Sequence, residues 1–191
     1  MPRTSSLDWL ARASRSGRAA SVAASVALAV LPLANAGAAS EQVLPLFTIA
    51  KSENKNQVQY TVRVDEHCAP AGTAPVSAYW RMLERGPAAT EAILSIEEQA
   101  YGLANQSVVA SDANGGVVHA VLHALPSRPV TVVTSRGSDG TCQAVARVSI
   151  SGAPANLFNV YARLKWDGVE YLLVQGYALE GGRVVREKIA R

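Results

Sequence analysis

The chain has 191 residues, a formal net charge of +3 and 17% charged residues, which is typical of one globular domain. The whole net charge lies in residues 1–36, which hold four Arg and one Asp. The remaining chain carries 14 basic and 14 acidic residues, so we expect no basic surface and no binding of nucleic acid.

Residues 1–36 have the three parts of a signal peptide. A basic segment with four Arg precedes an apolar run at residues 19–33, and an Ala-Asn-Ala sequence ends at Ala36. The apolar run has 15 residues, whereas a helix that crosses a bilayer needs about 20. We therefore predict a signal peptide cleaved after Ala36, with Ala38 as the second choice and an uncleaved anchor as the alternative. The protein is expected to be exported, either periplasmic or extracellular, with no membrane span in the mature chain.

Short strands with frequent turns fill the rest of the chain. Residues 37–44 are expected to form a flexible leader and residues 45–191 a single β domain. The strand at residues 57–65 alternates strictly and points every second side chain to the core. The strands are predicted, in chain order, at residues 46–50, 57–65, 75–84, 107–110, 117–125, 130–135, 141–151, 157–166, 169–179 and 183–189.

One short helix is predicted between the strands. Ser95 has the side chain of an N-cap residue, and Glu98 stands three positions later, which is the capping-box spacing. Gly102 is expected to end the helix.

The longest strand pair is predicted around an Asp167-Gly168 turn, the strongest short hairpin signal in the sequence. This turn pairs Trp166 with Val169 and Lys165 with Glu170. The face expected to cover the core carries Phe158, Val160, Ala162, Leu164 and Trp166 on one strand, and Val169, Tyr171, Leu173, Gln175 and Tyr177 on the other.

These elements predict a mainly β protein: a single antiparallel β-barrel or β-sandwich of about 8–10 strands with one short helix. The absence of long helices between strands argues against a parallel α/β sheet. Two cysteines, Cys68 and Cys142, remain in the mature chain, and in an oxidising compartment they are expected to form a disulfide. Two separate buried thiols are the alternative.

Three patterns resemble catalytic or metal-binding motifs, and each has a simpler structural interpretation. Ser52 and Lys55 match S-x-x-K, but they fall between two strands instead of opening a helix. His119 and His123 are four positions apart on a predicted strand, roughly 13 Å, too far to share a metal ion. The Asp65-Glu66-His67 sequence combines two carboxylates with an imidazole, but nothing in the sequence indicates the pocket that general acid–base catalysis needs. We therefore predict no catalytic residues, no metal and no cofactor, and an enzyme is the least favoured class.

Several short motifs, taken in order, resemble the exported bacterial family catalogued as domain of unknown function 4833. They are Lys51-Ser52-x-Asn54-Lys55-Asn56-x-Val58-x-Tyr60, then Pro75-Val76 followed by Tyr79-Trp80, then Ile96-Glu97 and Ala100-Tyr101-Gly102. The resemblance implies export in a bacterium and a mainly β domain from about residue 46 to the C-terminus. The family has no established activity, so the resemblance assigns no catalytic role. It marks Asn54, Asn56, Tyr79, Trp80, Tyr101 and Gly102 as part of a defining surface or core.

For function, the prediction is a binding module that takes a small apolar ligand or an envelope component at one mouth of the β domain. The candidate ligand-binding residues are Asn54, Asn56, Tyr79, Trp80 and Tyr101. A structural or protein-interaction role in the cell envelope is the alternative.

Overall fold

The structure is a computed structural model that describes residues 41–166 and 168–190. The predicted signal peptide lies outside the described residues. Strand β1 begins at Gln42, so the last residues of the predicted leader belong to a strand. The elements are β1 Gln42–Lys51, β2 Gln57–Val64, β3 Val76–Arg81, β4 Thr90–Ala92, α1 Ser95–Tyr101, β5 Leu103–Asp112, β6 Gly115–Leu122, β7 Val130–Arg136, β8 Cys142–Ile150, β9 Ala153–Lys165, β10 Gly168–Ala178 and β11 Val184–Ala190.

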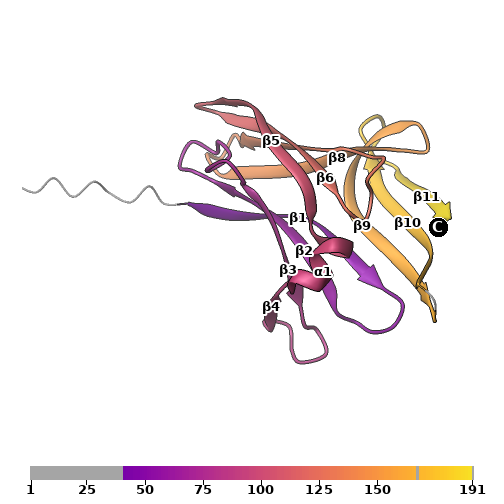
Figure 1. The fold of residues 1–191 in the computed structure, drawn as a ribbon. Helices are drawn as coiled ribbons and strands as arrows, with labels where there is room; N and C mark the ends of the chain where they lie inside the picture. The colour runs from indigo at the N-terminus through magenta and orange to yellow at the C-terminus, as the bar shows by residue number, and fades with distance from the viewer. Residues whose placement is uncertain (1–40, 167, 191) are drawn as a thin grey trace, which may run out of the picture. The chain divides into compact units, whose positions relative to one another are not determined.

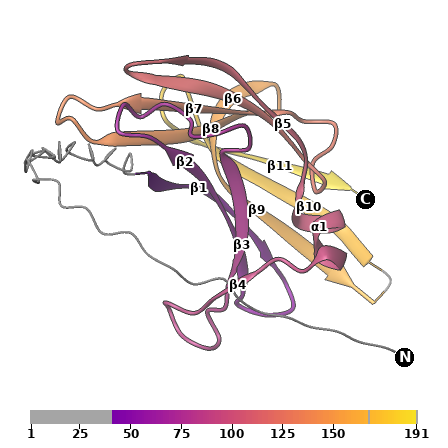
Figure 2. The same cartoon turned by 60° about the vertical axis from the view of Figure 1, so that its left-hand side comes forward.

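Strand β9 joins two halves of one sheet. Its first residues, Ala153 to Leu157, pair with β8, and its later residues, Asn159 to Ala162, pair with β1 along the same edge. One half therefore runs β4-β3-β2-β1 and the other β8-β7-β6-β5, while β10 and β11 follow on the other edge of β9. Figure 1 shows the two halves diverging from β9, and Figure 2 shows them from the side.

The core lies between these two halves. Strand β2 contributes four side chains with no exposed surface, which are Val58, Tyr60, Val62 and Val64. Strands β7 and β8 contribute Val132, Ala146 and Ile150 from the other half. The prediction that every second side chain of residues 57–65 points to the core is thus confirmed for these four residues. Since each half buries one apolar face against the other half, the architecture is a sandwich.

The predicted fold class is confirmed: the chain is mainly β with one short helix. The sheet does not close into a barrel, so the sandwich is the alternative that fits. Two details differ from the prediction. The pairing of β1 with β9 is parallel, and the described residues contain eleven strands because β4 was not predicted. Strand β4 has three exposed residues and no apolar alternation, so no sequence signal marks it.

The register predicted for the β9–β10 hairpin is wrong. Gly168 pairs with Lys165 instead of lying in the turn, and Glu170 and Phe158 each form an extra residue in the ladder. Each such bulge shifts the facing of the residues after it. As a result, Leu172 and Val174 of β10 are buried, whereas Trp166 is 97% exposed. The predicted core face is correct for Val160 and Ala162 on β9, and it is reversed along β10.

The predicted helix is present as α1, but its first turn differs. The N-cap position is Leu94, and Ser95 is the first helical residue. The backbone N–H of Leu94 donates to Glu97 Oε2 at 3.1 Å, so Glu97, not Glu98, caps this end. Gly102 follows the helix as expected, and a Cβ there would lie 2.5 Å from the Glu98 carbonyl oxygen, which only Gly avoids.

Candidate functional site: the α1 end of the sandwich

Helix α1 lies across one end of the sandwich, between β3 and the β9–β10 hairpin (Figure 2). None of its seven residues is buried. Side chains from the sheet hold it in place. Tyr60 Oη donates a hydrogen bond to the Tyr101 carbonyl, and Trp80 Nε1 donates to Glu97 Oε2 at 2.9 Å. The rings of Trp80 and Tyr101 meet edge to face, 5.2 Å between centroids. The helix is therefore attached by a few directed contacts and does not fill the core.

The two tyrosines at this end are held in their protonated form. Burial raises the pKa of the Tyr60 hydroxyl, and the neighbouring Tyr101 raises it further. Burial also raises the pKa of Tyr101, with Glu53 and Glu97 adding to the effect because their negative charges oppose a phenolate. Tyr60 can therefore donate to the α1 backbone throughout the physiological pH range.

A cleft of about 510 Å³, named the polar cleft for the Lys, Asn and Glu side chains in its lining, opens beside Trp80. Trp80 of β3 and Met82, the residue directly after β3, form its apolar part, and the Lys51 ammonium lies 4.9 Å from the centroid of the Trp80 ring. This volume falls in the range of about 300–1,000 Å³ that small-molecule sites occupy. The residues that line the polar cleft are Lys51, Asn54, Asn56, Trp80, Met82, Glu91, Ala92, Leu94 and Glu97.

An apolar pocket of about 210 Å³ lies beside Tyr101. Three of its lining residues, Ile49, Ala162 and Leu172, belong to the buried core. Small side chains leave the space, since three of the eight lining residues are Ala. The residues that line the apolar pocket are Ile49, Ala100, Tyr101, His123, Ala124, Ala162, Val169 and Leu172.

Three of the five candidate residues from the sequence lie together in the polar cleft: Asn54, Asn56 and Trp80. Tyr101 contacts Trp80 and lines the neighbouring apolar pocket. Tyr79 does not join them, because it precedes Trp80 on β3 and successive strand residues point to opposite faces. Ligand binding by these residues stays a prediction.

Sequence reasoning missed the charged residues of the polar cleft. Glu97 was interpreted only as a helix-capping residue, although its carboxylate also accepts from Trp80. Glu91 reaches the cleft from β4, a strand that no pattern marked. Lys51 stands inside the family motif, which was the one available signal for it.

The other patterns have structural roles. Ser52 Oγ accepts a hydrogen bond from the Leu164 backbone at 3.0 Å and ties the β1–β2 connection to β9. The Asp65 carboxylate accepts from the backbone N–H groups of His67 and Ala69, at 2.8 and 2.9 Å, and so orders the loop after β2. Both His119 and His123 are exposed. In residues 41–166 and 168–190, no three His, Cys, Asp or Glu side chains gather as a metal site.

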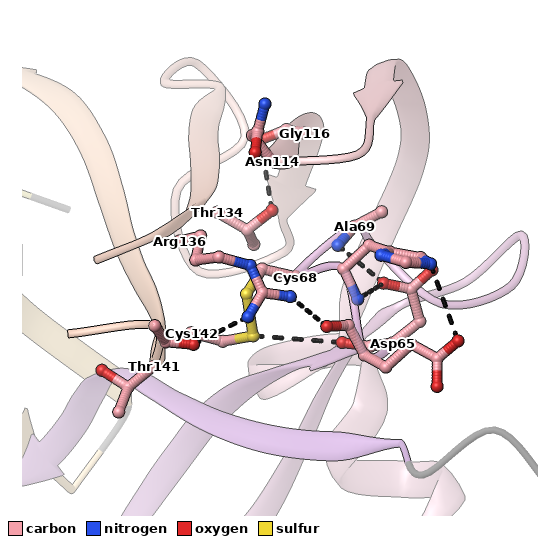
Figure 3. Close-up of a disulfide and its surroundings, with 12 residues drawn as sticks. Asp65, Cys68, Ala69, Asn114, Gly116, Thr134, Arg136, Thr141 and Cys142 are labelled. Atoms are coloured by element: carbon pink, nitrogen blue, oxygen red, sulfur yellow. Dashed lines mark hydrogen bonds and ion pairs between the residues drawn. A yellow bond between two sulfur atoms is a disulfide. The ribbon is translucent and has the colours of Figure 1, made fainter. Parts of the chain in front are cut away.

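The predicted disulfide is present in the structure. Cys68, in the loop after β2, is bonded to Cys142 at the start of β8, with 5.2 Å between their Cα atoms. Figure 3 shows that Arg136 and Asp65 lie beside it. Cys68 is completely buried and has a positive φ of 64°, which the turn held by Asp65 accommodates. The bond joins the two halves of the sandwich, because β2 belongs to one half and β8 to the other.

In a comparison with known protein families, residues 47–188 match the domain of unknown function DUF4833. The chain belongs to the DUF4833 family. The matched region extends from β1 into β11, so the DUF4833 domain is the whole sandwich described above, including α1 and both cavities beside it. No curated protein and no solved structure matched the chain. Within the described part of this DUF4833 protein, no helix is long and apolar enough to cross a membrane.

Proposed function

We propose that this protein is an exported binding module that takes a small apolar ligand in the apolar pocket beneath α1. The observation that supports the proposal is that the apolar pocket adjoins the hydrophobic core. Buried residues of β1, β9 and β10 (Ile49, Ala162 and Leu172) line a pocket of about 210 Å³, and the end of α1 lines another part of it although none of its own residues is buried. An apolar cavity of about 150 Å³ already admits benzene in other proteins, so this pocket has room for a small ring or a short alkyl chain.

The manner in which α1 is attached also supports this proposal. The helix has seven residues, which is too short to be stable alone, so it depends on its contacts with Tyr60 and Trp80. A short element held by a few directed bonds can move aside at low cost and admit a ligand to the space beneath it. The first 36 residues, interpreted as a signal peptide, support the export part of the proposal.

Binding of a neutral apolar dye tests the proposal. We expect 1-aminoanthracene to show saturable, one-to-one enhancement of its emission with the wild-type protein. Ala100→Leu would add apolar volume from α1 into the pocket, and it should weaken dye binding about tenfold or more. Gln99→Leu, the same new side chain at the neighbouring helical position, which does not line the pocket, is the matched control and should bind as wild type does. Equal binding by both variants, or no saturable binding at all, would contradict the proposal.

A protein-interaction role is the second candidate, and one observation favours it. Leu94 and Ile96 are 64% and 79% exposed at the start of α1. Exposed apolar side chains are typical of a contact surface where they form part of a contiguous apolar patch. If Ile96→Asp abolished association with an envelope component while leaving dye binding intact, the interaction role would be preferred.

A further inference from the structure

The polar cleft has two walls of opposite hydrogen-bonding character. Strand β3 pairs with β2 on one side and with β4 on the other, so the β1–β2 connection and the β4–α1 segment face each other across β3. Strands two apart in a sheet are separated by about 10 Å. Trp80 and Met82 lie between the walls and form the apolar part of the cleft.

The wall formed by the β1–β2 connection offers hydrogen-bond donors. Asn54 Oδ1 accepts from the backbone N–H of Asn56 at 3.0 Å, and Asn56 Oδ1 accepts from the backbone N–H of Glu84 at 3.2 Å. Each carbonyl oxygen therefore already accepts one hydrogen bond from the backbone. Among residues 41–166 and 168–190, neither Nδ2 group has a protein partner. Asn56 is only 8% exposed as a residue, yet its Nδ2 group is not among the fully buried atoms, so this donor is accessible from the cleft. The Lys51 ammonium adds a third donor.

The opposite wall offers acceptors. Glu97 uses Oε2 for Trp80 Nε1 and for the Leu94 backbone, and its Oε1 has no protein partner within the described part of the chain. Glu91 pairs with Arg85 through Oε1 and lines the cleft beside it. Carboxylate oxygens accept several hydrogen bonds each, so both residues retain acceptor capacity.

This arrangement selects against a ligand with a single charge. An anion would be close to Glu91 and Glu97, and a cation would be close to Lys51. A ring with hydroxyl groups around its edge can accept from one wall and donate to the other, while its C–H face packs on Trp80 and Met82.

We propose that the polar cleft is a binding site for a neutral, polyhydroxylated ring, in chemical terms a sugar. This site is a different cavity from the apolar pocket, so the inference goes beyond the proposed function, and either one can fail without the other.

Matched sugars that differ only in charge test the inference. The indole N–H resonance of Trp80, assigned by its loss in Trp80→Phe, reports on the cleft because this group donates to Glu97. We expect glucose, galactose, mannose or N-acetylglucosamine to shift this resonance saturably below 100 mM. Glucuronate and glucosamine share the glucose ring but carry a negative and a positive charge, and each should bind at least threefold more weakly than glucose.

Two variants connect the effect to the donor wall. Asn54→Asp keeps the oxygen that accepts from Asn56 but replaces the free donor by an acceptor, so it should fold normally and lose at least fivefold in sugar affinity. Tyr79→Phe, on the opposite face of β3, is the control and should bind as wild type does. No shift with any of the four neutral sugars, or tighter binding of glucuronate or glucosamine, would overturn the inference. Unchanged affinity in Asn54→Asp would overturn it as well.

Discussion

At the scale of single residues, Arg128 and Glu187 form the best-defined ion pair of the molecule. The Arg128 guanidinium contacts both carboxylate oxygens of Glu187, and the Ser151 backbone N–H donates to the same carboxylate. These bonds lower the pKa of Glu187 to about 2, with the Arg128 hydrogen bond as the main cause. The pair joins the β6–β7 connection to β11 and so stabilises the C-terminal strand.

A pH series on Glu187→Gln tests this pair. Because the carboxylate has a lower pKa when folded than its usual 4.5, its stabilising effect is present above about pH 4.5 and is lost as pH falls towards 2. At pH 7 the variant should be less stable than wild type by about 1–2 kcal/mol in urea unfolding. The difference between the two proteins should shrink between pH 4.5 and pH 2. A difference that stays constant over that window would contradict the assignment.

Trp166 provides a second test at this scale. It is 97% exposed at the tip of the β9–β10 hairpin, so its large side chain contributes little to the core. We expect Trp166→Ala to change the free energy of unfolding by no more than about 0.5 kcal/mol. A loss of about 3 kcal/mol or more, typical of a buried aromatic residue, would mean that this indole is packed against the protein.

At the scale of elements, the β9–β10 hairpin depends on its bulges. Leu172 and Leu173 are neighbours of the same type, yet Leu172 lies in the core and Leu173 points to the other face. Leu172→Ala should cost about 2–5 kcal/mol, and Leu173→Ala about 1 kcal/mol or less. The free energies of unfolding of the two variants, measured by chemical denaturation, show which of the two leucines lies in the core and so test the register. If Leu173→Ala cost more stability than Leu172→Ala, the hairpin would have the register predicted from the sequence, which contains no bulges.

At the scale of the whole molecule, the disulfide connects the two halves of the sandwich. It joins residues 74 positions apart, so it restricts a long loop of the unfolded chain. Cys142→Ser should lower the free energy of unfolding by about 2–5 kcal/mol. The intact mass of the native protein should be about 2 Da below that of the reduced protein, since one bond removes two hydrogens. Two thiols that titrate in the native protein would contradict the bridge.

The sequence by itself determined the local features of this protein. Alternation identified the buried side of β2, turn residues separated most strands, and the two cysteines of the sequence allow only one intramolecular pairing. Each of these properties depends on a few neighbouring residues or on a simple count. The order of short motifs was also sufficient to identify the DUF4833 family.

The tertiary structure decided the register of the hairpin, the sandwich and the candidate site. Bulges at Phe158 and Glu170 have no local sequence signal, because an extra residue is tolerated only where the neighbouring strands and the core accept it. The polar cleft combines Lys51 and Asn56 with Glu97, which lies about forty residues later and reaches them only because β3 pairs with both β2 and β4. Strand pairing is non-local, so residues distant in the chain become neighbours only when the whole sheet forms.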